Sequence, residues 1–141
     1  MHGSLAYDCH LSRDCIVPEM QILIVDDDPS HLKLYSWILA RGNFVPISLL
    51  VSGPSLPVPA DSSINLAVVD YRLGNDWTAV QVIQRLRQAF PDLPVVMLSD
   101  FSWLPDDVAP FVSAFVRKGE PQELLETISS ILANKAHEQT S

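Results

Sequence analysis

Short apolar segments that end at or directly before a polar residue constrain the fold of this chain more than any other feature. Four such segments occupy residues 21–25, 66–70, 95–98 and 114–117. A short run that is apolar on both faces is typical of a strand buried in a parallel sheet. Residues 44–50 are predicted to form a further strand, in which Pro46 indicates an edge position because proline cannot donate a backbone hydrogen bond. We therefore expect five strands.

Helical patterns separate several of these strands. Asp28 is suited to cap a helix that begins at Pro29, a residue favoured at the first helical position. Apolar residues then recur at helical spacing until Gly42, which is expected to end the helix. Further helices are predicted over residues 77–90 and from Pro121 onward, each with apolar residues along one face.

The two remaining connections carry weaker helix signals. Residues 52–65 contain three prolines and are predicted to be mostly loop, since a proline inside a helix costs about 3 kcal/mol. Residues 105–112, with Pro105 and Pro110, are predicted to hold at most a short helix. Strands that alternate with helices or long crossovers indicate an α/β fold with a doubly wound, five-stranded parallel sheet. Its second and fourth helices are expected to be short or irregular.

Length and composition narrow the class of protein. The 141 residues fit one domain, expected over residues 21–134, with 1–20 as a disordered leader and 135–141 as a polar tail. A net charge of −8 without a basic patch argues against direct binding of nucleic acid. No apolar run reaches the roughly 18 residues of a membrane helix, and the first residues do not resemble a signal peptide. We therefore expect no membrane insertion and a cytoplasmic location.

Polar side chains stand at the carboxyl ends of the predicted strands, where ligands bind in doubly wound sheets. They are Asp26, Asp27, Asp70, Ser99 and Lys118. One polar residue at a strand end carries little information, but three carboxylates, a hydroxyl and an ammonium group together predict a site. Clustered carboxylates repel one another unless a cation neutralises them, and oxygen ligands of this kind suit Mg²⁺. A carboxylate in such surroundings can act as a nucleophile toward a phosphoryl group.

Four segments of the chain resemble a known family. They are residues 22–29 (ILIVDDDP), 66–73 (LAVVDYRL), 94–99 (PVVMLS) and 115–118 (FVRK). In this order they are similar to segments of the receiver domains of response regulators, which act in bacterial two-component signal transduction. The resemblance covers about residues 21–133. It implies the flavodoxin-like receiver fold, also found in chemotaxis regulators, and a phosphorelay function.

The resemblance implies a set of metal-binding residues. Asp27 and Asp70 would bind Mg²⁺ directly, together with the backbone carbonyl of Arg72. Asp26 would act mainly through a water molecule bound to the metal. Mg²⁺ is the one cofactor that the resemblance implies.

The resemblance also implies how phosphorylation would proceed. Asp70 would accept the phosphoryl group, with Ser99 hydrogen bonded to it and Lys118 paired with its charge. Ser99 and Phe115 would switch the domain between two states, and a plain core aromatic is the alternative interpretation of Phe115. The domain would not be an enzyme beyond catalysing its own phosphotransfer and dephosphorylation. Its partners would be a sensor histidine kinase or phosphotransfer protein and an unknown downstream protein, with a second copy of the chain as a further candidate.

Two other functions are compatible with the same residues. The chain could be a degenerate receiver that binds a partner without phosphorylation. It could also be a Mg²⁺-dependent phosphatase with an aspartate nucleophile, but such enzymes usually need a second aspartate two residues later, where this chain has Arg72.

Asp100 departs from the family pattern, which usually has a small residue after the hydroxyl residue. If its carboxylate faces inward, at an effective dielectric near 20 a like charge about 6 Å from the phosphoryl group costs about 3 kcal/mol. If it faces solvent, screening makes it nearly silent. The family's preference for a small residue there implies limited space and favours a measurable inhibition.

Overall fold

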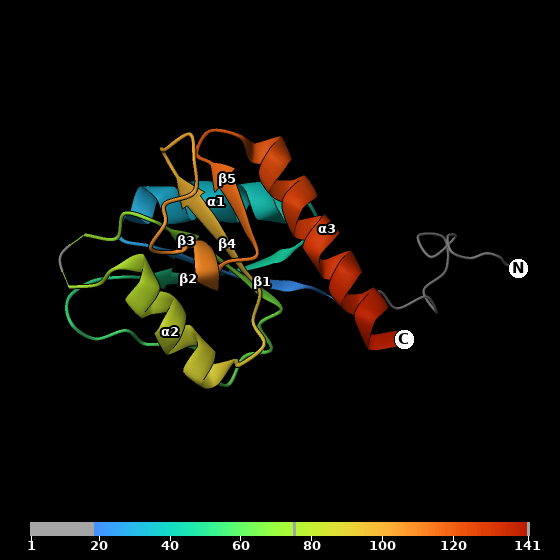
Figure 1. Ribbon diagram of the computed structural model, residues 1–141, viewed down its shortest axis with the longest axis horizontal. Coiled ribbons are helices and arrows are strands. Elements are labelled where there is room, and N and C mark those ends of the chain that lie inside the picture. Colours follow the sequence, from blue (N-terminus) through green and yellow to red (C-terminus); the bar gives the residue numbers. More distant parts are fainter. Residues whose placement is uncertain (1–18, 75, 141) are drawn as a thin grey trace, which may run out of the picture.

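A five-stranded parallel sheet with the order β2-β1-β3-β4-β5 forms the centre of the molecule (Figure 1). The computed structural model describes residues 19–74 and 76–140. The strands are β1 (Gln21–Asp26), β2 (Val45–Leu50), β3 (Leu66–Asp70), β4 (Val95–Ser99) and β5 (Ala114–Arg117). The helices are α1 (Pro29–Arg41), α2 (Ala79–Ala89) and α3 (Pro121–Thr140), with a short 3-10 turn, η2 (Ala109–Phe111). The predicted doubly wound parallel sheet and the edge position of the strand with Pro46 are confirmed.

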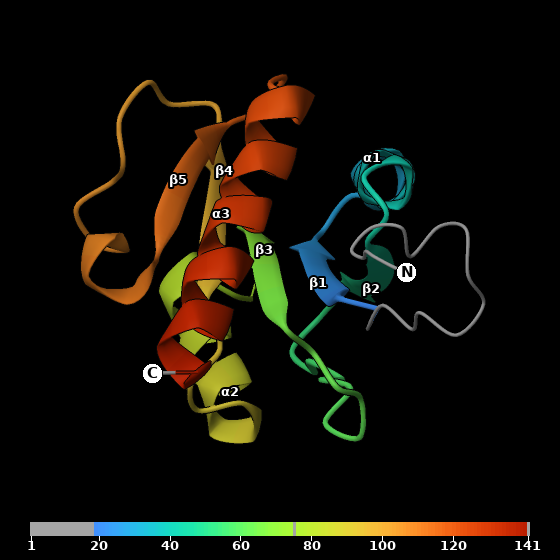
Figure 2. The ribbon, with the colours of Figure 1, turned by 90° about the vertical axis from the view of Figure 1, so that its right-hand side faces the viewer.

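Both faces of the sheet are buried, as apolar runs without alternation predict. Helices α1 and α3 cover one face, and α2 covers the other (Figures 1 and 2). Successive residues of β1 point to opposite faces, so that Ile22 packs beneath α1 and α3 while Leu23 packs with the α2 side. None of the described helices is long and apolar enough to cross a membrane.

Loop segments complete the cover of the α2 face. Residues 51–65 form the connection that the prolines predict, anchored by the buried side chains of Val51 and Leu56. Its middle part makes only local backbone hydrogen bonds, such as that from the Ala60 N–H to the Val58 carbonyl at 2.8 Å. The connection between β4 and β5 likewise holds no more than the 3-10 turn η2. Neither of these two described connections holds a regular α-helix, which confirms the expectation that the helices between β2 and β3 and between β4 and β5 are short or irregular.

Two helix boundaries differ from the prediction. The helix expected over 77–90 begins at Ala79, because Thr78 and Gln81 form a reciprocal capping box while the Trp77 indole donates to the Gly53 carbonyl at 3.1 Å. Helix α3 continues to Thr140, so that residues 135–140, expected as a polar tail, prolong the helix. Lysine, alanine, glutamate and glutamine, which make up most of this segment, have high helix propensity, and hydrophobic periodicity does not detect such an extension. The predicted leader falls almost wholly outside the described residues.

Candidate functional site

Three polar side chains are buried at the carboxyl edge of the sheet. Asp26, Asp70 and Ser99 are the last residues of β1, β3 and β4, with exposed fractions of 1%, 3% and 1%. Lys118 directly follows β5. Because these strands are parallel and adjacent, their ends meet at one edge, as the sequence predicts.

Asp70 and Lys118 form an ion pair at the centre of this edge. The Lys118 Nζ lies 3.0 Å from Asp70 Oδ1 and 3.1 Å from Oδ2. Burial works to lower the pKa of Lys118, but the hydrogen bond and the negative charge of Asp70 outweigh it, and the net pKa is raised. Lys118 therefore stays protonated and holds a positive charge against the Asp70 carboxylate.

One ammonium group does not compensate both buried carboxylates. Burial, and then the charge of Asp70, raise the pKa of Asp26 to about 7. The Asp28 backbone N–H, which donates to Asp26 Oδ1 at 3.0 Å, opposes this rise only in part. A carboxylate so poorly compensated is suited to a divalent cation, and its oxygens are the ligands that Mg²⁺ prefers. The residues present therefore fit the metal that the sequence predicts.

The other two predicted metal-binding residues lie beside this pair. Asp27 is exposed, and a β-carbon built at Gly74 would lie 3.1 Å from its Oδ2, which places the carboxylate against the loop after β3. Hydrogen bonding to Asp27 also helps to raise the pKa of Asp26, after burial and Asp70. The Arg72 N–H donates to Asp70 Oδ1 at 3.2 Å, while its guanidinium lies over the Phe101 ring. Metal binding by Asp27 and by the Arg72 carbonyl stays a prediction.

The predicted switch residues occupy neighbouring strands. The Ser99 hydroxyl accepts a hydrogen bond from the Phe101 N–H at 3.1 Å. Phe115 lies opposite Met97 in the β4–β5 register and is partly buried against the α2-side core. A partly exposed aromatic next to the site is compatible with a switch, and that role stays a prediction.

His31 also belongs to the site, and the sequence reasoning missed it. Its Nδ1 lies 3.3 Å from Asp26 Oδ2, and its Nε2 lies 3.6 Å from Asp28 Oδ2. One ligand atom each from His31, Asp26 and Asp70 lie within 4.8 Å of one another. The signal that could have found it is the predicted cap at Asp28, which places His31 in the first turn of α1, next to the end of β1.

Comparison with solved structures identifies the fold. No family model matches the sequence. A response regulator receiver domain protein from Methanospirillum hungatei is 25% identical, with a TM-score of 0.73 over 86% of this chain and 99% of that one. The chain has the fold of response regulator receiver domains. The response regulator TrrA from Thermotoga maritima, solved in complex with Mg²⁺ and BeF, has the same fold, with 18% identity, a TM-score of 0.67 and coverage of 80% and 98%.

Curated relatives of the receiver domain are regulatory proteins. The transcriptional regulatory protein GlrR from Escherichia coli is 27% identical over 62% of this chain, and the photosynthetic apparatus regulatory protein RegA from Rhodovulum sulfidophilum is 27% identical over 80%. The receiver domain spans 20% of GlrR and 62% of RegA.

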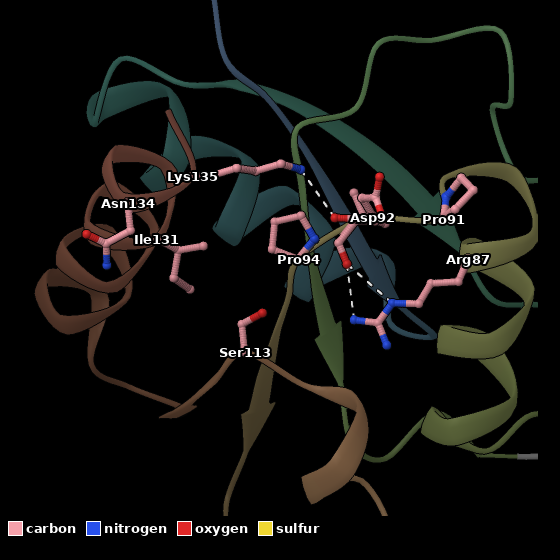
Figure 3. Close-up of a pocket in the computed structure, with 9 residues that line it drawn as sticks. Arg87, Pro91, Asp92, Pro94, Ser113, Ile131, Asn134 and Lys135 are labelled. Carbon is pink, nitrogen blue, oxygen red and sulfur yellow. Dashed lines mark hydrogen bonds between the residues drawn. The ribbon is translucent and has the colours of Figure 1, made fainter. Parts of the chain in front are cut away.

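A pocket of about 750 Å³ lies at the opposite edge of the sheet (Figure 3). Its lining includes Pro94 and Ser113, which directly precede β4 and β5. Arg87 donates to the Leu93 carbonyl at 3.1 and 3.3 Å, and Lys135 donates to the Asp92 carbonyl at 3.2 Å. Both cations thus bind the loop before β4, and the pocket is remote from the carboxylate cluster.

Proposed function

We propose that this receiver domain accepts a phosphoryl group on Asp70 from a histidine kinase or phosphotransfer protein, in a Mg²⁺-dependent reaction. The observation that supports this most is the buried Asp70 carboxylate, held between the Lys118 ammonium group and the Asp26 carboxylate. Phosphorylation would then change the binding of a downstream protein. The names of the curated relatives, all regulatory proteins, support a signalling role of this kind.

The proposed reaction uses groups that are already in place. An Asp70 oxygen attacks phosphorus, an O–P bond forms, and the P–N bond to the donor imidazole breaks with its electron pair left on nitrogen. Lys118 orients the carboxylate beforehand and afterwards pairs with the phosphoryl oxygens. Ser99 supplies a hydroxyl that can donate to the same group. When bound by Asp26, Asp27 and Asp70, Mg²⁺ supplies positive charge that stabilises the transferring phosphoryl group.

Beryllofluoride, an acyl-phosphate mimic, tests the proposed function directly. We expect the receiver domain to bind it only when Mg²⁺ is present, as a bound ¹⁹F NMR signal and a rise in melting temperature. TrrA was solved with this ligand, which makes it a reasonable probe for a protein of the same fold. Mg²⁺ binding without any beryllofluoride binding would instead favour a receiver that works without phosphorylation.

Asp27→Ala is expected to weaken Mg²⁺ binding by at least about tenfold, because it removes a carboxylate from the cation site. Calorimetric titration with Mg²⁺ measures this change. Asp92→Ala is the matched control, since it removes a carboxylate at the opposite edge of the sheet. Unchanged Mg²⁺ affinity in Asp27→Ala would show that the metal binds elsewhere.

Asp100→Ala is expected to change the rate of phosphorylation by less than about threefold. Asp100 is exposed, which favours the solvent-facing alternative, and salt screens an exposed charge. Burial lowers the pKa of Lys118, and the hydrogen bond and charge of Asp70 raise it. The charge of Asp100 also raises this pKa, but by less than Asp70 does. A time course of labelling by acetyl phosphate, followed by intact mass spectrometry, measures the rate. An increase beyond tenfold would establish Asp100 as an inhibitory residue.

The partners and location belong to the same proposal. A kinase or phosphotransfer protein would donate the phosphoryl group in the cytoplasm, and the domain would catalyse only its own phosphorylation and dephosphorylation. A second copy of the chain is a further candidate partner.

A further inference from the structure

We infer that His31 is a nitrogen ligand of the divalent cation bound beside Asp70, and that it shifts the selectivity of the site from Mg²⁺ toward ions such as Ni²⁺ and Zn²⁺. The inference rests on the cation site of the proposed function, but it concerns which ion the site prefers. It assigns a role to a side chain that the phosphorylation chemistry leaves unused.

The spacing of the three side chains fits a shared ion. Ligands bound about 2.1 Å from an octahedral ion lie about 3.0 Å apart when adjacent and about 4.2 Å apart when opposite. His31 Nδ1 lies 3.3 Å from Asp26 Oδ2, close to the spacing of adjacent ligands. The full set, which adds Asp70, lies within 4.8 Å, so small side-chain rotations suffice to close the site.

The hydrogen bonding of the imidazole supports the same role. Although 42% of the His31 side chain is exposed, its Nδ1 atom is buried and has no hydrogen-bond partner among the described residues. Its short approach to Asp26 therefore lacks the geometry of a hydrogen bond. A buried nitrogen that faces two carboxylates without a hydrogen bond is placed as a metal ligand would be before the metal binds.

The outer nitrogen of the ring has a carboxylate nearby. Histidine ligands usually donate their second N–H to a carboxylate or carbonyl, which orients the ring. His31 Nε2 lies 3.6 Å from Asp28 Oδ2, and the other oxygen of Asp28 is fixed by the Ser30 N–H at 2.8 Å. Asp28 thus caps α1 and stands where it can orient the imidazole.

The nitrogen ligand determines which ions the site binds more tightly. Imidazole suits Ni²⁺, Co²⁺ and Zn²⁺, whereas Mg²⁺ prefers oxygen ligands and keeps several waters. Adding His31 to the carboxylates should therefore strengthen the binding of Ni²⁺ or Zn²⁺ much more than that of Mg²⁺.

The test is calorimetric titration of the full, tag-free chain with Mg²⁺ and with Ni²⁺. We expect His31→Gln to weaken Ni²⁺ binding at least about tenfold and to change Mg²⁺ binding by less than about threefold. His137→Gln is the matched control for Ni²⁺ bound by another histidine, and it should leave both affinities unchanged. With Zn²⁺, ¹⁵N NMR of the imidazoles should show a shift at His31 Nδ1 that requires a higher Zn²⁺ concentration in Asp27→Ala.

The outcomes separate this inference from the proposed function. Unchanged Ni²⁺ affinity in His31→Gln, with Mg²⁺ binding that still depends on Asp27, would overturn the inference alone. Tighter binding of both ions in His31→Gln would also overturn it, because the imidazole would then compete with the metal as a cation. If the wild-type chain binds neither ion, or binds both independently of Asp27, the proposed cation site fails as well.

Discussion

Asp70→Asn is expected to abolish phosphorylation of this receiver domain by acetyl phosphate. The amide has no negative charge and a delocalised nitrogen lone pair, so it cannot attack phosphorus as the carboxylate does. It also removes the ion pair with Lys118, whose Nζ lies 3.0 Å from the carboxylate. Intact mass spectrometry should show an added phosphoryl group on the wild type that is stable to acid and labile to base, and none on the variant.

The matched control for this loss is Asp92→Asn, which changes a carboxylate at the far edge of the sheet and should keep full labelling. Labelling that persists in Asp70→Asn but disappears in a variant of Asp26 or Asp27 would move the phosphoacceptor to that residue. Circular dichroism of both variants distinguishes the loss of a nucleophile from the loss of the fold.

Asp26→Asn is expected to stabilise the metal-free protein at pH 8, by up to about 4 kcal/mol. Burial and the charge of Asp70 raise the pKa of Asp26 from 3.8 to about 7, and each pH unit of difference corresponds to about 1.4 kcal/mol. Because the folded state holds this proton more tightly than the unfolded state, the stability from Asp26 is fully present below pH 3.8 and is lost as the pH rises through 7. The neutral amide avoids that loss.

Urea unfolding in EDTA at pH 5.5 and pH 8 measures this effect. Wild-type protein should lose stability between these two pH values, whereas Asp26→Asn should lose much less. Asp61→Asn, in the exposed part of the loop before β3, is the control and should follow the wild type. A variant that is less stable than the wild type at pH 8 would contradict the cost assigned to burying the charged Asp26 carboxylate beside Asp70.

The sequence predicts the strands and their polar ends well because burial on both faces leaves an unbroken apolar run. The ion pair between Asp70 and Lys118 follows from that pattern, since parallel strands bring their ends to one edge. The prolines of residues 52–65 predict the loop for an equally direct reason, because they remove helical hydrogen bonds.

Other features depend on side-chain direction, which hydrophobic periodicity does not contain. His31 is polar and half exposed, so no apolar pattern marks it, and only the packing of α1 against β1 brings it to Asp26. The hydrogen bond from Trp77 to Gly53 joins two loops that are 24 residues apart in the chain. The capping box at Thr78 was readable from the sequence and would have given the correct start of α2.

Two helices cover one face of the sheet, whereas one helix and long loops cover the other, and this difference has a consequence for local opening. Backbone amides in α1 and α3 are held by helical hydrogen bonds, whereas, among the described residues, the backbone of residues 57–63 makes hydrogen bonds only within its own loop. Such a segment can detach without unfolding the sheet, at a free-energy cost below that of global unfolding. Hydrogen exchange should therefore be fast over this loop and slow over α1. Because the Val51 N–H, at the start of the loop, donates to the Asp26 carbonyl at 2.9 Å, fluctuations of the loop can reach the proposed phosphorylation site while the α1 side keeps its structure.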